Sequence, residues 1–225
     1  MNIKDYGFKD NINTDKTIAR IVATHKDRYE IVCNEGQGFA QIKRGCYYDN
    51  PDSIYPTTGD FVAIQWNPTG DSMIYETLKR ESSFSRTAST SDRNHKLHNQ
   101  HEQLVAANFD YVFIIQSLNN NFNLHRIERY LSLAWESGGV PVIVLTKMDL
   151  VPNVQEYIKQ VENIAFGVEI YAVSCVTKQG LDNLEKYFSK GNTIVFLGSS
   201  GVGKSTLVNT LYGKEVMKTS EIREE

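Results

Sequence analysis

Short apolar runs separated by turn sequences dominate the first eighty residues. Alternating polar and apolar positions, as in Arg28–Cys33, are typical of strands with one buried face. Asn, Gly, Asp and Pro gather between the runs, for example at 34–36 and 67–71, where they favour turns. The pattern predicts five strands, at residues 18–23, 28–33, 38–42, 60–66 and 73–78. Five short strands in about sixty residues predict a small closed barrel, of which the OB-fold is the commonest five-stranded form.

The pattern changes from residue 106 onward. Continuous apolar runs, typical of strands buried on both faces, now alternate with segments whose apolar residues recur at helical spacing. The runs predict strands at 111–116, 140–145, 169–173 and 193–197, with helices at 124–137, 154–165, 181–188 and 206–212. Strands that alternate with helices predict a parallel α/β sheet, which binds ligands at the carboxyl ends of its strands.

A polar, locally basic segment lies between these two regions. Ser, Thr, Asn and His accumulate there, which favours a linker. We therefore expect a barrel at 1–80, a linker at 81–105 and an α/β domain at 106–225. His95, His98 and His101 recur every three residues in the linker. This histidine spacing has two interpretations: a metal site, or a solvated segment that faces RNA.

Composition narrows the function classes. A net charge of −3 and a pI near 6.0 give no global basic signal, so nucleic-acid binding would require a local patch. The three cysteines, Cys33, Cys46 and Cys175, form no C-x-x-C and predict neither a disulfide framework nor a zinc site. The N-terminus lacks a signal-peptide core and no apolar run approaches a membrane span, so we expect a cytoplasmic protein.

The predicted barrel carries residue types that suit single-stranded nucleic acid. Aromatic rings stack on bases, and Lys or Arg side chains contact phosphates. The alternative interpretation is that most of these aromatics pack in the barrel core. The candidates are Phe39, Tyr47, Tyr48, Tyr55 and Trp66, together with Lys43 and Arg44.

A phosphate-binding loop follows the last predicted strand. Its sequence fits G-x-x-x-x-G-K-[ST] at every fixed position and stands between an apolar run and a helical pattern. In such loops, glycines turn backbone N–H groups toward a phosphate, and the helix N-terminus adds partial positive charge. Lys204 would reach the β- and γ-phosphates, and Ser205 would hold Mg²⁺. The loop consists of Gly198, Ser199, Ser200, Gly201, Val202, Gly203, Lys204 and Ser205, followed by Thr206.

The strand at 140–145 ends in Thr146, Lys147, Met148 and Asp149, which resemble the guanine-specificity element [NT]-K-x-D of GTPases. A carboxylate such as Asp149 accepts two hydrogen bonds from guanine, whereas adenine offers no such donor pair. The stem of Lys147 can pack along the base. The alternative interpretation is a surface lysine followed by a helix N-cap aspartate.

Two further elements follow the strand at 169–173. Ser174 and Cys175 are similar to the [ST]-[ACG] element whose backbone contacts the guanine oxygen. Residues 180–184 resemble the G-[IVL]-x-x-L that opens the next helix in these proteins. Together with the phosphate-binding loop, these elements predict guanine-nucleotide binding.

The order of the elements is unusual. Ordinary GTPases begin with the phosphate-binding loop, whereas here the two base-binding elements precede it. A small β-barrel followed by this permuted order resembles the ribosome-small-subunit-dependent GTPase A family (RsgA, also called YjeQ or YloQ). The resemblance covers nearly the whole chain.

The resemblance implies a cytoplasmic GTPase that acts late in maturation of the 30S ribosomal subunit. Its OB barrel would contact 16S rRNA, and its cofactors would be GTP or GDP with Mg²⁺. The resemblance assigns the phosphates to residues 198–206, with Lys204 stabilising their charge. It assigns Mg²⁺ to Ser205 and the base to residues 146–149 and 174–175. We expect a monomer, and Zn²⁺ only in a C-terminal domain that this chain lacks.

The end of the chain departs from the family pattern. After the phosphate-binding loop there is no D-x-x-G, and the sequence holds no Cys/His zinc module. We therefore expect a chain truncated before its switch regions, with an incomplete sheet and poor GTP hydrolysis. Two alternatives stay open: an ATP-using P-loop enzyme, and an RNA-binding module whose guanine-nucleotide site is only a regulatory switch.

Overall fold

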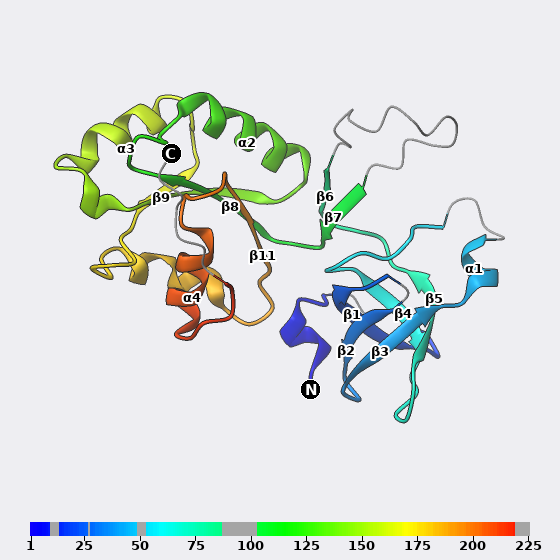
Figure 1. Ribbon diagram of the computed structural model, residues 1–225. Coiled ribbons are helices and arrows are strands. Elements are labelled where there is room, and N and C mark those ends of the chain that lie inside the picture. The colour runs from blue at the N-terminus through cyan, green and yellow to red at the C-terminus, as the bar shows by residue number, and fades with distance from the viewer. Residues whose placement is uncertain (10–13, 27, 49–52, 87–102, 219–225) are drawn as a thin grey trace. The chain divides into compact units, whose positions relative to one another are not determined.

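The computed structural model of the chain describes residues 1–9, 14–26, 28–48, 53–86 and 103–218. It divides into two compact units (Figure 1). The first comprises Met1–Phe109 together with Lys190–Thr193, and the second comprises Asp110–Ser189 together with Ile194–Glu225. Each unit has its own hydrophobic core.

The first unit contains a closed five-stranded barrel, as predicted. Its strand order is β1-β2-β3-β5-β4, and the circle closes where β4 pairs with β1. All neighbours are antiparallel except β3 and β5, which run parallel. The middle of β1 and the end of β2 are buried, and Ile21 and Ile31 from these two strands belong to the core of the barrel. The strands are β1 (Thr17–Thr24), β2 (Tyr29–Cys33), β3 (Gln37–Ile42), β4 (Phe61–Gln65) and β5 (Ser72–Thr77).

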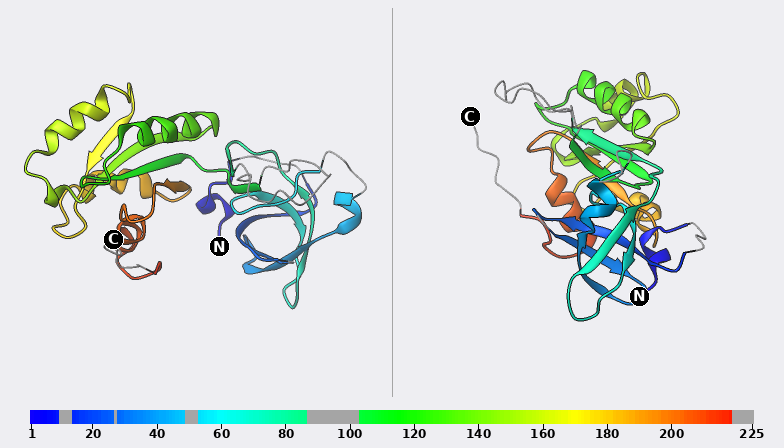
Figure 2. Two further views of the ribbon diagram at one scale, coloured as in Figure 1. Left: turned by 45° about the horizontal axis from the view of Figure 1, so that its top comes forward. Right: turned by 90° about the vertical axis from the view of Figure 1, so that its right-hand side faces the viewer.

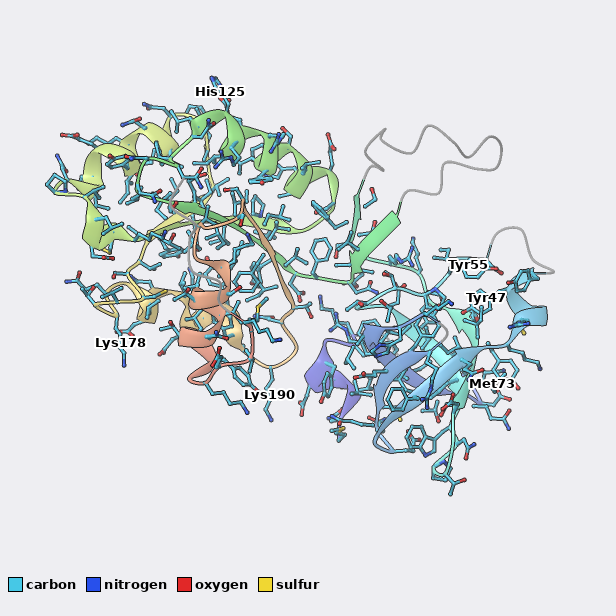
Figure 3. All side chains as sticks on the ribbon, in the orientation of Figure 1. Tyr47, Tyr55, Met73, His125, Lys178 and Lys190 are labelled. Atoms are coloured by element: carbon cyan, nitrogen blue, oxygen red, sulfur yellow. The ribbon has the colours of Figure 1, made fainter. Side chains whose placement is uncertain are left out.

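A short helix that the sequence did not predict, α1 (Arg44–Tyr48), follows β3. Tyr47 belongs to this helix and lies beside Tyr55 (Figure 3). The centroids of the two rings are 5.5 Å apart. Tyr47 is only 3% exposed, and its hydroxyl lies 2.9 Å from Oγ1 of Thr77. The prediction that Tyr47 stacks on a base is therefore wrong, because its ring belongs to the barrel core.

A buried arginine holds the loops of the first unit together. The guanidinium of Arg20, which is 6% exposed, donates to the carbonyl oxygens of Tyr6, Gly59 and Asn108. It also donates to Oγ1 of Thr193 at 2.8 Å. This contact explains why residues 190–193 pack with the barrel although the strand that follows them does not. Tyr6 ends the 3₁₀ helix η1 (Ile3–Tyr6).

The two ends of the segment predicted as a linker pair with each other. Strands β6 (Ser83–Arg86) and β7 (Gln103–Ala107) form an antiparallel two-stranded sheet. His95, His98 and His101 lie outside the described residues.

The second unit contains a parallel four-stranded sheet in the order β10-β9-β8-β11. Helices α2 (Leu124–Glu136) and α3 (Val154–Glu162) cover one face, and α4 (Lys204–Tyr212) lies on the other (Figures 1 and 2). This arrangement confirms the predicted α/β domain. The strands are β8 (Tyr111–Ser117), β9 (Val140–Thr146), β10 (Glu169–Ala172) and β11 (Ile194–Leu197).

The strands of this sheet carry apolar side chains on both faces, which explains why they appear in the sequence as continuous apolar runs. Phe113, Val144 and Val173 are inaccessible to solvent and join one cluster with Leu207 of α4. The predicted helix at 181–188 is a 3₁₀ helix, η3 (Leu181–Phe188), which buries Leu181, Leu184 and Tyr187. Among the described residues, no helix has the length and apolar character needed to cross a bilayer.

Candidate guanine-nucleotide site

The strand order of the parallel sheet places a crevice between β8 and β11. The chain passes from β8 to β9 to β10 in one direction and then adds β11 on the other side of β8. In open α/β sheets, ligands bind at the carboxyl ends of the strands where the order reverses. The register aligns those ends, because Ser117 pairs with Thr146 and Ala172 pairs with Leu145. Every candidate base- or phosphate-binding element follows one of these strands.

The phosphate-binding loop connects β11 to α4, as predicted. Gly201 and Gly203 adopt φ of 76° and 92°, which side-chain-bearing residues rarely adopt. Gly198 is required for a different reason: a Cβ there would lie 2.6 Å from the carbonyl oxygen of Ile115. The loop therefore lies directly against β8, and its turns depend on glycine.

Lys204 stands in the first turn of α4 and folds back over the loop. Its Nζ donates to the carbonyl oxygens of Gly198 at 2.8 Å and Ser199 at 2.6 Å. Burial lowers the pKa of the Lys204 ammonium. This cation is held by neutral carbonyl oxygens, so a phosphate group is its natural charge partner.

Two residues at the end of β9 contact the phosphate-binding loop: Thr146, the last residue of the strand, and Lys147, which follows it. Oγ1 of Thr146, which is 2% exposed, donates to the carbonyl oxygen of Val202 at 2.6 Å. Nζ of Lys147 donates to the carbonyl oxygen of Gly201 at 3.0 Å. Lys147 has a φ of 60°, and such left-handed backbone in a non-glycine residue is concentrated at functional sites. The structure thus joins the T-K-M-D segment to the loop it was predicted to accompany.

The second base-binding element lies beside the first. The backbone N–H of Met148 donates to the carbonyl oxygen of Val173 at 3.2 Å, next to the buried Ser174. Burial raises the pKa of the Cys175 thiol, and the negative charge of Asp149 adds a smaller contribution in the same direction. Residues 146–149 and 174–175 therefore form one cluster.

Asp149 does not cap a helix, contrary to the alternative interpretation. It lies inside the 3₁₀ helix η2 (Met148–Leu150), and the N-cap of α3 is Asn153. Its carboxylate is exposed and accepts no hydrogen bond from the part of the chain that the structure describes. A carboxylate in this state retains its full capacity to accept two hydrogen bonds from a base.

Ser205 and Thr206 complete the predicted phosphate and metal residues. Ser205 is half-buried in the first turn of α4, and Thr206 is exposed. Within the described residues there is no group of three or more Asp, Glu, His or Cys side chains that would enclose a metal ion. Mg²⁺ in nucleotide sites keeps several waters and binds phosphate oxygens, so one hydroxyl ligand such as that of Ser205 fits this chemistry.

A polar network at the end of β8 was not predicted from the sequence. Nε2 of Gln116, a side chain that is 1% exposed, donates to the carbonyl oxygen of Asn121 at 2.7 Å. Asn121 and Arg126 both donate to Oγ of Ser199, at 3.3 Å and 3.1 Å. The signal available in the sequence was the run of asparagines at 119–121, directly after a buried strand.

Solved structures share this architecture. The chain superposes on YjeQ from Thermotoga maritima with a TM-score of 0.69 and 26% identity, covering 87% of this chain and 65% of that one. It also superposes on YloQ, described as a circularly permuted GTPase, with a TM-score of 0.64 and 21% identity. That match covers 90% of this chain and 66% of YloQ, and at its level of identity it supports the fold alone.

Curated relatives match the full length of the chain. Small ribosomal subunit biogenesis GTPase RsgA 1 of Listeria innocua is 40% identical over 230 residues, covering 100% of this chain and 63% of the relative. RsgA 1 of Bacteroides thetaiotaomicron is 35% identical, covering 98% and 62%. The chain thus spans less than two thirds of the length of these relatives. The family model described as RsgA GTPase matches residues 78–225, well over half of the chain. The chain therefore belongs to the RsgA GTPase family.

Proposed function

We propose that this chain binds guanine nucleotide at the carboxyl end of its parallel sheet and hydrolyses GTP. The observation that carries the proposal is the direct contact between the T-K-M-D segment and the phosphate-binding loop. Thr146 and Lys147 donate to the carbonyl oxygens of Val202 and Gly201, which are consecutive residues on opposite sides of one peptide bond. A nucleotide whose phosphates lie in the loop therefore has its base beside residues 146–149.

Each element has a defined role in this proposal. Backbone N–H groups of residues 198–206 and the N-terminus of α4 bind the phosphates. Asp149 accepts hydrogen bonds from guanine, the stem of Lys147 packs along the base, and the backbone at Ser174 and Cys175 approaches the guanine oxygen. The site rejects adenine because adenine offers no pair of donors to the Asp149 carboxylate, which would then accept no hydrogen bond from the base.

Lys204 has a second role when GTP is present. Its ammonium leaves the carbonyl oxygens of Gly198 and Ser199 and neutralises charge on the β- and γ-phosphates. Ser205 would hold Mg²⁺, and the ion would neutralise the negative charge that develops on the transferred phosphoryl group. The desolvated position of Lys204 strengthens its interaction with an anion, because less water competes.

The family implies a ribosomal partner. We propose that the chain associates as a cytoplasmic monomer with the small ribosomal subunit late in 30S maturation and that its barrel contacts 16S rRNA. Support comes from three cation–aromatic pairs on the barrel. Arg28 lies 4.0 Å from the ring centroid of Phe39, and Lys43 and Lys16 lie 4.4 and 5.0 Å from that of Tyr75. Lys43 offers charge for a phosphate beside an aromatic ring, whereas Arg28 also pairs with Asp71 at 2.5 Å and Lys16 with Asp15 at 3.7 Å.

Equilibrium titration with GDP tests the nucleotide site. Lys204→Ala is expected to weaken GDP binding by tenfold or more, because it removes a charge-assisted contact worth about 1.5–3 kcal/mol. Lys214→Ala is the matched control. Lys214 is exposed, lies beyond the end of α4 and packs over the ring of Tyr212, at the opposite end of the helix from the phosphate-binding loop. Equal GDP affinity in both variants would contradict the proposed phosphate site.

Co-sedimentation with purified 30S and 50S subunits tests the ribosomal partner. The chain is expected to sediment with 30S subunits in the presence of a non-hydrolysable GTP analogue, and Lys43→Ala is expected to weaken that binding and reduce its salt dependence. Glu76→Gln on the neighbouring β5 is the control for a general effect on the barrel. Equal binding to both subunits, or a Lys43→Ala variant with unchanged salt dependence, would argue against an rRNA-binding barrel.

A further inference from the structure

Arg126 of α2 contacts the phosphate-binding loop through neutral groups alone. Its Nη1 donates to Oγ of Ser199 at 3.1 Å, to Oδ1 of Asn121 at 2.8 Å and to the carbonyl oxygen of Asn121 at 3.2 Å. No carboxylate in the part of the chain that the structure describes pairs with this guanidinium. A half-buried cation with only neutral acceptors retains most of its capacity to attract an anion.

The place of Arg126 along α2 is electrostatically unfavourable. It stands in the first turn, three residues after the N-cap Asn123, where the helix dipole is positive and favours negative side chains. The residue before it, His125, points away from the unit (Figure 3) and pairs with Glu128 at 3.0 Å. Arg126 instead lies against the phosphate-binding loop, where helix dipole and loop N–H groups already concentrate positive potential. The contacts to Asn121 and Ser199 hold the guanidinium beside the loop, where it adds to the attraction for an anion.

Arg126 and Lys204 approach the same residue of the loop. Lys204 donates to the main-chain oxygen of Ser199 and Arg126 to its side-chain oxygen. A phosphate-loop lysine reaches the β- and γ-phosphates, so a second cation that contacts the same loop residue lies on the phosphate side of the site. Gln116 and Asn121 fix the Arg126 side chain from the β8 end, because Gln116 holds the carbonyl that Arg126 also contacts.

We propose that Arg126 contacts the γ-phosphate of bound GTP and thereby makes the site prefer GTP over GDP. The inference rests on the proposed guanine-nucleotide site and adds a recognition residue that lies outside its sequence motifs. The Nε and Nη2 groups carry the contact. Among the described residues they donate to no protein acceptor, and the planar guanidinium offers them as a pair. The Nη1 contacts to Asn121 keep the side chain in position meanwhile.

Competition titrations of the full chain with GDP and with a non-hydrolysable GTP analogue test this proposal. Arg126→Met keeps much of the side-chain length but removes the charge. It is expected to weaken binding of the GTP analogue by about tenfold or more while GDP affinity stays within about twofold. Arg126→Lys, which restores a point charge without the paired donors, is expected to recover part of the preference.

Arg129→Met is the matched control, because Arg129 is exposed on the same helix and stacks on Tyr130. It is expected to leave both affinities unchanged. If Arg126→Met weakens GDP and the GTP analogue equally, the residue only supports the loop and the proposal is overturned. If it changes neither affinity, the proposal is equally overturned. Absence of GDP binding by the unmodified chain would instead refute the nucleotide site itself, so the two failures are distinguishable.

Discussion

Oγ1 of Thr146 donates a 2.6 Å hydrogen bond to the carbonyl oxygen of Val202, although 56 residues separate the two along the chain. The first residue ends β9 and the second lies in the turn before α4. Both side chains are buried, so water cannot replace the bond. The contact ties the base-binding segment to the phosphate-binding loop. The permuted motif order therefore has no consequence for the site, which depends on strand neighbours rather than on chain order.

Replacing the Thr146 hydroxyl by a methyl group tests the contribution of its hydrogen bond to the Val202 carbonyl oxygen. Thr146→Val keeps the shape but leaves the Val202 carbonyl without this donor, so the free energy of unfolding is expected to fall by about 1–3 kcal/mol. GDP affinity is expected to fall as well, because the loop loses its anchor to β9. Urea unfolding and GDP titration measure the two effects. Thr177→Val, at an exposed threonine of the same unit, should change stability by less than about 0.5 kcal/mol. Equal stability of the two variants would show that the bond contributes nothing.

The same glycine-to-alanine substitution at Gly198, which begins the phosphate-binding loop, and at Gly213, which follows α4, distinguishes steric crowding from backbone strain. Gly198→Ala would place a Cβ 2.6 Å from the Ile115 carbonyl oxygen, so the loop must move away from β8. Gly213→Ala meets nothing within 4 Å but keeps a φ of 74°, which costs about 1–2 kcal/mol. We expect Gly198→Ala to weaken GDP binding by tenfold or more and Gly213→Ala by no more than twofold. GDP titration of both variants decides, and a normal affinity for Gly198→Ala would mean that the loop does not need its contact with β8.

The ion-pair cluster at the start of β10 predicts a pH dependence. Hydrogen bonds from Lys186, Tyr187 and Tyr171 lower the pKa of Glu169 from 4.5 to about 2. Because the folded-state pKa is the lower one, the cluster stabilises the fold fully above pH 4.5 and loses this effect as the pH falls toward 2. The contribution is at most about 1 kcal/mol, since the side chain of Glu169 is 53% exposed.

Glu169→Gln is therefore expected to lower the melting temperature slightly at pH 7 and to match the unmodified chain near pH 2. Thermal unfolding followed at pH 7, 4.5 and 2 measures this convergence. Glu162→Gln, at an exposed glutamate of α3, serves as the control and should show no such difference at any pH. A Glu169→Gln deficit that persists undiminished at pH 2 would rule out the ionised carboxylate as its source.

Strands were predictable from the sequence where apolar runs end at turn residues. The turn residues at 34–36 and 67–71 separate β2 from β3 and β4 from β5, and Phe113 to Ile115 form an unbroken apolar run because β8 is buried on both faces. Helix α1 was missed because five residues are too few to show a period. Strands β6 and β7 were missed because their pairing joins segments separated by a long polar stretch.

The site was predictable only as far as its motifs are contiguous. Residues 198–206 and 146–149 carry spacings that the chemistry demands, so they can be recognised without a structure. Tertiary contacts leave no such pattern: Arg126 and Ser199 are 73 residues apart. Nor does the sequence show that Lys147 adopts a left-handed backbone, because lysine has no preference for that conformation.

Nucleotide selectivity before and after Asp149→Asn tests the central claim most directly. Titration of the unmodified chain with GDP, ADP and XDP should show GDP bound far more tightly than the other two. Asp149→Asn should lose GDP affinity and gain XDP affinity, because the asparagine amide can donate to the xanthine oxygen that replaces the guanine amine. Asp182→Asn, at an exposed aspartate of η3, should keep the preference for GDP. Equal affinity of the unmodified chain for GDP and ADP, or an Asp149→Asn variant that still prefers GDP, would contradict the assignment of a guanine site.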